Sequence, residues 1–140
     1  DAKQTDLNLL LDKYNLTATQ QEYDMLLSLI FNTGSGILIN SENKQTKRWF
    51  ETGGYKNIEY SKYVLGDITS GGDAGVMNRK ADELEILMGV DYLKRTDNYE
   101  RILSDTGERI WNNPSKINEL AIVWENSLDD VQGEPDNENP

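Results

Sequence analysis

The stretch TQQEYDMLLSLIFNTG, residues 19–34, decides the fold of this chain. It opens with Thr19 and Glu22, the spacing of a capping box, in which each side chain accepts a hydrogen bond from the other residue's backbone N–H. Apolar residues then recur at helical spacing and form one continuous stripe: Tyr23, Leu26, Leu27 and Ile30. Gly34 and Gly36 follow, and glycine commonly ends a helix. The stretch therefore predicts an amphipathic helix, and we expect it to be the central core helix.

Further helices are predicted on both sides of this stretch. A helix before Asn15 is indicated by four residues on one helical face: Leu7, Leu10, Leu11 and Tyr14. A short apolar turn at residues 37–39 leads to Ser41, which we expect to cap a helix that ends at two glycines and carries Trp49 and Phe50. The pattern of residues 55–65 does not decide between helix and loop, although three positions suit a helix face: Tyr60, Tyr63 and Val64.

The second half of the chain is also expected to be helical. Residues 71–92, GGDAGVMNRKADELEILMGVDY, combine a glycine-rich turn with a helix capped by Asp73 and closed by Gly89. Residues 97–104 suit a short helix. A final amphipathic helix should open at Ser115, with six apolar positions: Ile117, Leu120, Ala121, Val123, Trp124 and Leu128. Residues 129–140 contain five acidic residues and no basic one, which predicts a disordered acidic tail.

The composition excludes several classes of function. The chain has 25 acidic and 14 basic residues, a formal net charge of −11. Such a charge argues against binding to nucleic acid, which depends on neutralising phosphates, and against docking on anionic lipid. It would suit a basic protein partner. No apolar run is long enough to span a membrane.

The residue types also limit the available chemistry. The sequence contains no Cys and no His, which excludes thiol nucleophiles, His-based triads and His/Cys zinc sites. We therefore expect no cofactor and no metal. Hydrolysis of a glycosidic bond would need two carboxyl groups. Six carboxylates are candidates by number alone, and their spacing selects no catalytic pair: Glu22, Asp24, Asp73, Asp82, Glu83 and Glu85.

Two motifs, taken in order, resemble the C-terminal part of phage-type lysozymes, the muramidases that cut peptidoglycan. The first is an apolar helix that runs into Phe31-Asn32-Thr33-Gly34, and the second is the glycine-rich turn followed by Asn78-Arg79 and another helix. The resemblance covers about residues 4–92. It implies an all-α helical bundle similar to the larger lobe of these enzymes, formed by residues 1–92. Residues 93–128 would then add a C-terminal helical extension, followed by the acidic tail.

The resemblance also implies a set of substrate-binding residues. In this family the turn after the apolar helix lines the saccharide cleft, so Phe31 would pack against a sugar and Asn32 would offer a donor and an acceptor to an N-acetyl group. Gly34 would allow close backbone approach. Asn78 and Arg79 would lie at the rim of the cleft, where the matching arginine approaches the catalytic glutamate.

Each of these residues also has a purely structural interpretation. Phe31 could be the last core residue, with Asn32 to Gly34 as an ordinary helix C-cap, and Arg79 could sit in solvent at a helix start. The segment Lys47-Arg48-Trp49 has a looser parallel in the family. There we expect an aromatic core residue beside a solvated charge pair.

The family's catalytic hairpin, which carries a Glu general acid followed by Asp, Thr and His, has no counterpart in this sequence. We therefore expect the chain alone to be inactive and assign it no catalytic residue. The function implied is that of a peptidoglycan-hydrolysing module, as in a phage lysin or secreted antibacterial effector, acting on glycan strands in the periplasm or cell wall. An upstream segment would supply the catalytic glutamate. The alternative is a non-catalytic glycan- or protein-binding module derived from a lysozyme.

Overall fold

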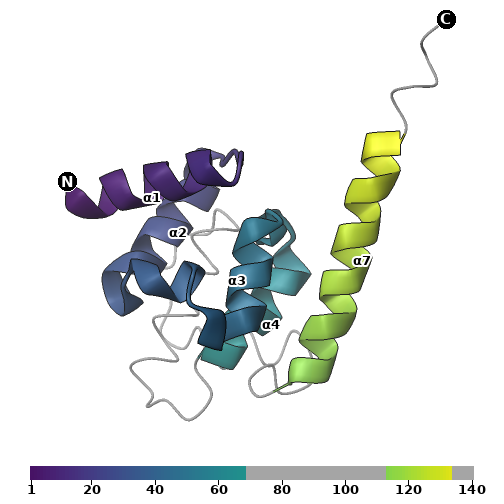
Figure 1. Cartoon of the computed structure of the whole chain (residues 1–140). Coiled ribbons are helices and arrows are strands. Elements are labelled where there is room, and N and C mark those ends of the chain that lie inside the picture. Colours follow the sequence, from purple (N-terminus) through teal and green to yellow (C-terminus); the bar gives the residue numbers. More distant parts are fainter. Residues whose placement is uncertain (69–112, 134–140) are drawn as a thin grey trace, which may run out of the picture.

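The structure is a computed structural model that describes residues 1–68 and 113–133. Within these residues the chain forms α-helices and short 3-10 helices and no strand, which confirms the all-α class (Figure 1). The α-helices are α1 (Ala2–Lys13), α2 (Gln20–Thr33), α3 (Lys44–Glu51), α4 (Ile58–Ile68) and α7 (Pro114–Gly133). The 3-10 helices η1 (Ser35–Leu38) and η2 (Ser41–Asn43) connect α2 to α3, and η3 (Gly54–Lys56) connects α3 to α4.

The first two helices form as the sequence predicts. The Glu22 N–H donates to Thr19 Oγ1 at 3.2 Å, and the Thr19 N–H donates to Glu22 Oε1 at 2.9 Å, which completes the expected capping box. On α1, Leu7 and Leu11 are buried, so the predicted face does point into the core. Asn15 follows α1 with a φ of 56°, a left-handed conformation that asparagine tolerates, and it turns the chain toward α2.

The expected cap of the third helix is wrong by one residue. Asn40, not Ser41, caps the segment: its Oδ1 accepts the Glu42 N–H at 2.8 Å. Asn40 has the extended backbone of a capping residue, whereas Ser41 is already the first residue of η2. Because η2 comes first, α3 begins only at Lys44 and is two turns long.

The ambiguous segment after the two glycines is a helix. Asn57 Oδ1 accepts the Tyr60 N–H at 2.9 Å and starts α4. Tyr60, Tyr63 and Val64 are all buried, as a helix face requires. A Cβ added to Gly54 would lie 2.6 Å from Tyr60 Cε2, so the close approach of η3 to α4 depends on glycine at this position.

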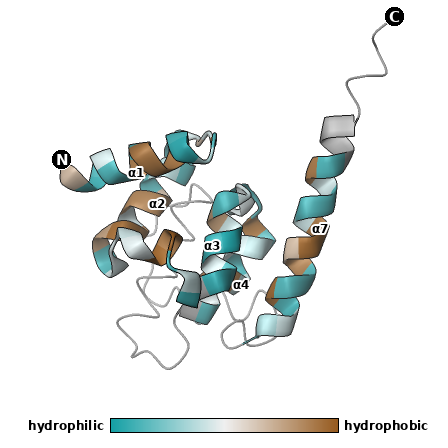
Figure 2. Ribbon diagram, viewed as in Figure 1, coloured by the Kyte–Doolittle hydropathy of each residue, from teal (hydrophilic) through white to brown (hydrophobic). Residues whose placement is uncertain are grey.

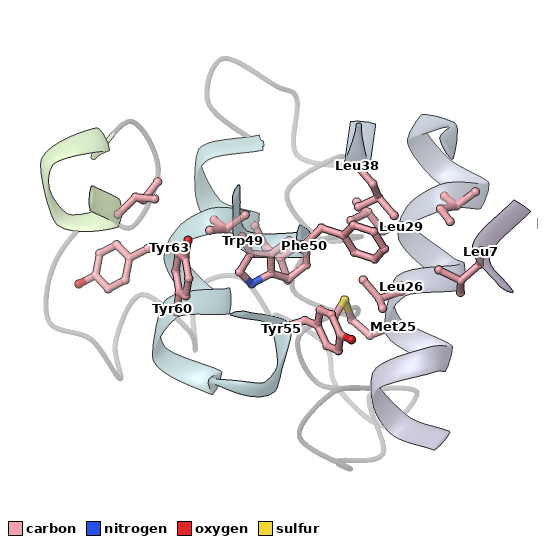
Figure 3. Packing of buried hydrophobic residues seen from close by; sticks show 14 of the residues in the cluster. Leu7, Met25, Leu26, Leu29, Leu38, Trp49, Phe50, Tyr55, Tyr60 and Tyr63 are labelled. Carbon is pink, nitrogen blue, oxygen red and sulfur yellow. The ribbon is translucent and has the colours of Figure 1, made fainter. Parts of the chain in front are cut away.

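The core joins the five α-helices that the structure describes and has an aromatic centre (Figure 3). Leu26 is fully buried, which places α2 in the core as expected, whereas Leu27 is only partly buried. Two of the buried aromatic side chains are hydrogen-bonded inside the fold: Trp49 Nε1 donates to Ser61 Oγ at 3.1 Å, and the Tyr55 hydroxyl donates to the Thr17 carbonyl at 2.6 Å. The buried cluster consists of Leu7, Leu11, Met25, Leu26, Leu29, Ile30, Leu38, Trp49, Phe50, Tyr55, Tyr60, Tyr63, Val64, Leu65, Ile117 and Ala121.

The C-terminal helix α7 packs against α3 and α4. Ile117 and Ala121 belong to the same buried cluster as residues 1–68, so α7 shares their core. Asn113 caps the helix by accepting the Lys116 N–H at 3.3 Å, with Pro114 at the first helical position, where its missing N–H costs nothing. Val123, expected among the apolar core positions, is instead 62% exposed, because the buried face of α7 passes through Ala121.

The helix α7 is also longer than the charge pattern indicates. It ends at Gly133, so residues 129–133, which the sequence assigns to the acidic tail, are helical. Acidic residues do not by themselves stop a helix, and Gly133 and Pro135 are the first residues after position 128 that favour an end. The helices expected within residues 71–92 and 97–104, Trp111 and the rest of the tail lie outside the described residues. None of the helices that the structure describes is long and apolar enough to cross a membrane.

Candidate functional site

The strongest candidate site is the turn at the end of α2, residues 31–34. The Gly34 N–H donates to the Ile30 carbonyl at 2.7 Å and caps the helix, and Thr33 Oγ1 donates to the Leu29 carbonyl at 2.6 Å. Phe31 and Asn32 both lie exposed on this last turn. The helix end is therefore held by its own backbone, while two side chains capable of recognition face outward.

Phe31 is not the last core residue, so this part of the structural interpretation is wrong, whereas the helix C-cap expected in this turn is present at Gly34. Its side chain is 57% exposed, whereas the preceding residue, Ile30, is fully buried. The reason is helical phase, because Phe31 falls on the side of α2 opposite its buried residues, which are Met25, Leu26, Leu29 and Ile30. The ring is available to pack against a ligand.

Gly34 is required by the backbone rather than by crowding. Its φ of 87° lies in the region that side chains rarely adopt. A Cβ built there would meet no atom of the described residues within 4 Å, so none of them fills the space beside the turn. The described part of the chain therefore leaves room for a ligand that approaches the backbone closely.

The structure brings together only part of the predicted site. Phe31, Asn32 and Gly34 share one turn, as their adjacency in the sequence requires. Asn78 and Arg79 lie outside the described residues, so their placement beside this turn stays a prediction.

The described carboxylates among the six candidates have structural roles. Glu22 closes the capping box of α2 and also pairs with Lys56 Nζ at 2.9 Å. Asp24 accepts a hydrogen bond from Gln20 Nε2 at 2.8 Å on the exposed face of α2. Burial raises the pKa of Asp67, a carboxyl near the end of α4 that the sequence analysis does not single out. Glu22 and Asp24 are thus each engaged by a neighbouring side chain or backbone group, and Asp73, Asp82, Glu83 and Glu85 lie outside the described residues.

A second surface feature lies on α3. It is an open depression of about 280 Å³ lined by Ser41, Lys44, Lys47, Arg48 and Glu51, and we refer to it as the α3 depression. Most of the ribbon of α3 has the colour of hydrophilic residues (Figure 2). Its position follows from the sequence of α3, in which Trp49 and Phe50 turn inward and leave the charged residues outside.

Lys47 and Arg48, expected as a solvated charge pair beside an aromatic core residue, are partly exposed and each form an ion pair, and Trp49 is buried as expected. Lys47 Nζ bonds Glu51 Oε1 at 2.5 Å, and this hydrogen bond raises the lysine pKa. Arg48 forms a two-pronged pair with Glu125 of α7, with Nε at 2.6 Å and Nη2 at 2.7 Å from its oxygens, and Nη1 donates to Asn118 Oδ1 at 3.0 Å. The bond to Glu125 raises the pKa of Arg48. The Lys47–Glu51 pair has the helical i,i+4 spacing and could have been foreseen, whereas the Arg48–Glu125 pair joins residues 77 positions apart.

Two further observations limit the chemistry of the described residues. The Tyr60 hydroxyl is buried and has no hydrogen-bond partner there, and burial raises its pKa to about 12. Within residues 1–68 and 113–133, no group of three or more His, Cys, Asp or Glu side chains is placed to hold a metal ion.

The comparisons with known proteins give no relative for this arrangement. No family model, curated protein or solved structure matches the chain.

Proposed function

We propose that this chain is the glycan-binding helical lobe of a peptidoglycan-hydrolysing muramidase. In this proposal the lobe holds the glycan strand, and a separate segment supplies the catalytic carboxylates. The observation that carries the proposal is the exposed ring of Phe31 at the end of the central core helix, beside Asn32 and Gly34.

The chemistry of this turn suits an N-acetylated sugar. A pyranose ring presents a flat C–H face, which can pack against a phenyl ring, and the 57% exposure of Phe31 leaves that ring accessible. The carboxamide of Asn32 can donate to and accept from an N-acetyl group. Gly34 carries no side chain to keep the sugar away from the backbone.

The order of motifs along the chain gives a second line of support. The Phe31–Gly34 turn precedes the glycine-rich turn and Asn78-Arg79, in the order of the phage-type lysozymes. In the proposed enzyme, Arg79 would make a two-pronged, charge-assisted contact with the catalytic glutamate of the other segment. Such a contact favours the ionised carboxyl, and burial favours the protonated one, so their balance would set the pKa of the general acid.

The proposal assigns no acid–base role to the described carboxylates. Glu22 is occupied by the capping box and by Lys56, and Asp24 is bonded to Gln20. A glycosidase places two carboxyl groups on either side of the bond that it cuts. The isolated chain should therefore bind peptidoglycan without cleaving it.

A sedimentation assay with insoluble peptidoglycan tests this proposal. The 140-residue chain should sediment with the polymer and release no reducing ends. Phe31→Ala should lower the bound fraction at least fivefold, because it removes the ring that packs on the sugar. Val123→Ala is the matched control, since Val123 is a similarly exposed apolar side chain on α7.

Two results would contradict the proposal. Equal binding by wild type and Phe31→Ala would remove the turn from the site. Release of reducing ends at the rate of a complete lysozyme would show that the chain carries its own catalytic pair.

A purely binding module is the second candidate, and the same exposed turn would serve it. The two candidates differ in the role of Arg79. In a chain that also carries a catalytic segment, Arg79→Ala should strongly reduce hydrolysis while leaving glycan binding intact. An unchanged rate would favour the binding module.

A further inference from the structure

The α3 depression has a chemistry different from that of the Phe31–Gly34 turn. We propose that it binds one anionic oxygen group, a carboxylate or a phosphate, carried by the same polymer whose glycan the turn holds. This inference rests on the proposed function and adds a second, electrostatic contact to it.

The distribution of charge is the first argument. The chain has a net charge of −11, yet Lys44, Lys47 and Arg48 fall within five consecutive residues and line one depression. One carboxylate, Glu51, lines it with them. An anion near this molecule would be repelled by most of the surface and attracted here.

The fixed position of Arg48 is the second argument. Its guanidinium is held on three sides by Glu125 and Asn118, at distances of 2.6 to 3.0 Å. A guanidinium has more N–H donors than these three bonds use. The remaining donors are held in place before a ligand arrives, so little rotamer entropy is lost when they bind an oxygen.

The two lysines complete the donor set. Lys47 is charged and held by Glu51, and an ammonium group can still donate further hydrogen bonds. The side chain of Lys44 is exposed and makes no hydrogen bond or ion pair with any residue that the structure describes. Among the described residues that line the depression, it is therefore the cation most available for a ligand.

The charges of the side chains at the depression indicate how much negative charge the ligand should carry. Three cations meet two carboxylates at this place, Glu51 inside the depression and Glu125 on Arg48, so one positive charge is left over. One carboxylate or one singly charged phosphodiester would neutralise it. The open depression of about 280 Å³ would accept such a group together with part of its carrier.

The position of the depression connects it to the proposed glycan site. Its residue Ser41 belongs to η2, which follows η1 and the Phe31–Gly34 turn along the chain. Both η1 and η2 pack against α3, so the two surfaces lie on neighbouring segments. Peptidoglycan carries carboxylates on its peptide stems, and wall polymers attached to it carry phosphodiesters, so either substituent could supply the anion.

Binding measurements on three polymers test the inference. The polymers are intact peptidoglycan, peptidoglycan from which phosphate-bearing polymers have been removed, and chitin, which has an N-acetylated glycan without anions. The double variant Lys44→Gln/Lys47→Gln should bind intact peptidoglycan at least fivefold more weakly and chitin unchanged. The matched control, Lys3→Gln/Lys13→Gln, makes the same charge change on α1 and should bind all three polymers like wild type.

The second polymer identifies the source of the anion. If the fivefold difference persists after phosphate removal, the ligand is a stem-peptide carboxylate, and if it disappears, the ligand is the phosphate. The single variant Lys44→Glu guards against an effect of misfolding. It should fold like wild type, because the side chain of Lys44 is exposed and makes no hydrogen bond or ion pair with the described residues. It replaces a positive charge in the depression by a negative one, so it should weaken the binding of intact peptidoglycan and leave the binding of chitin unchanged.

The outcomes separate this inference from the proposed function. Equal peptidoglycan binding by wild type and both lysine variants would overturn the anion site, whatever the turn does. A wild-type chain that fails to bind chitin would contradict the glycan site, while a selective loss in the lysine variants would still support the anion site.

Discussion

Helix α2 with its turn and the contact between α3 and α7 are held by interactions of opposite range. In α2 the decisive bonds join close neighbours: Thr19 with Glu22 at its start and Gly34 with Ile30 at its end. In the α3–α7 contact, Arg48 reaches Glu125 across 77 positions, and Trp124 Nε1 donates to the Thr52 carbonyl at 2.9 Å across 72. The first region forms from local rules, and the second exists only once the chain has folded.

The difference matters for the two proposed surfaces. The turn presents Phe31 because of helical phase alone, so its exposure follows from the geometry of α2. The α3 depression depends on α7, because Glu125 and Asn118 hold the arginine that lines it. Changes in α7 should therefore disturb the anion site and leave the glycan site intact.

The largest expected effect tests the local region. Leu26→Ala should lower the free energy of unfolding by about 2–5 kcal/mol, because it leaves a cavity at a fully buried position. Leu27→Ala should cost about 1 kcal/mol, since that side chain is only partly buried. Chemical denaturation of both variants measures the difference, and equal losses would mean that the buried face of α2 is misassigned.

The next effect tests the long-range region. Trp124→Phe should lower the free energy of unfolding by about 1–2 kcal/mol, because it leaves the Thr52 carbonyl without its donor. Val123→Ala, one residue away but exposed, should change stability by less than about 0.5 kcal/mol. Thermal melts of the two variants give the comparison. A larger loss of stability in Val123→Ala than in Trp124→Phe would mean that α7 turns a different face toward the core.

A smaller loss of stability is expected when the N-cap of α2 is removed. Thr19→Ala should cost about 1 kcal/mol, because the Glu22 N–H loses its capping partner. Thr17→Ala is the control, since Thr17 is exposed and contributes its backbone carbonyl to the bond with Tyr55. If both substitutions had the same effect on the melting temperature, the capping box would not stabilise α2.

The smallest effect concerns the ion pair between the helices. A double-mutant cycle of Arg48→Ala and Glu125→Ala should give a coupling energy of about 0.2–1 kcal/mol, because the side chains are 38% and 33% exposed and water screens them. The coupling should decrease as salt is added. A coupling of zero at low salt would show that the Arg48–Glu125 ion pair does not help to hold α7.

Local signals allowed much of the described fold to be predicted from the sequence. The capping box at Thr19 and the glycine at position 34 each act within a few residues, and the structure contains both. The predicted apolar stripe is right at Leu26 and Ile30, but the buried face also includes Met25 and Leu29, whereas Tyr23 and Leu27 are only partly buried. Asn40 was missed because Ser41 beside it is an equally good capping residue by type. The sequence does not decide between helix and loop for residues 55–65, because the cap of α4 is Asn57 and asparagine is equally common in turns.

The candidate site could be predicted only in part. The adjacency of Phe31, Asn32 and Gly34 made them one site in any fold, but their exposure depended on which side of α2 is buried. Neither the pairing of Arg48 with Glu125 nor the depression beside it leaves a signal in the sequence, because both depend on how α7 packs. The placement of Arg79 remains a prediction.

The most direct test of the central claim is an NMR titration of the ¹⁵N-labelled chain with the tetramer of N-acetylglucosamine. If the turn binds the glycan, the amide shifts should be saturable, largest at residues 31–36, small on α1 and α7, and lost in Phe31→Ala. Shifts centred on α7, or the absence of any saturable shift, would contradict the assignment of this turn as the glycan-binding site.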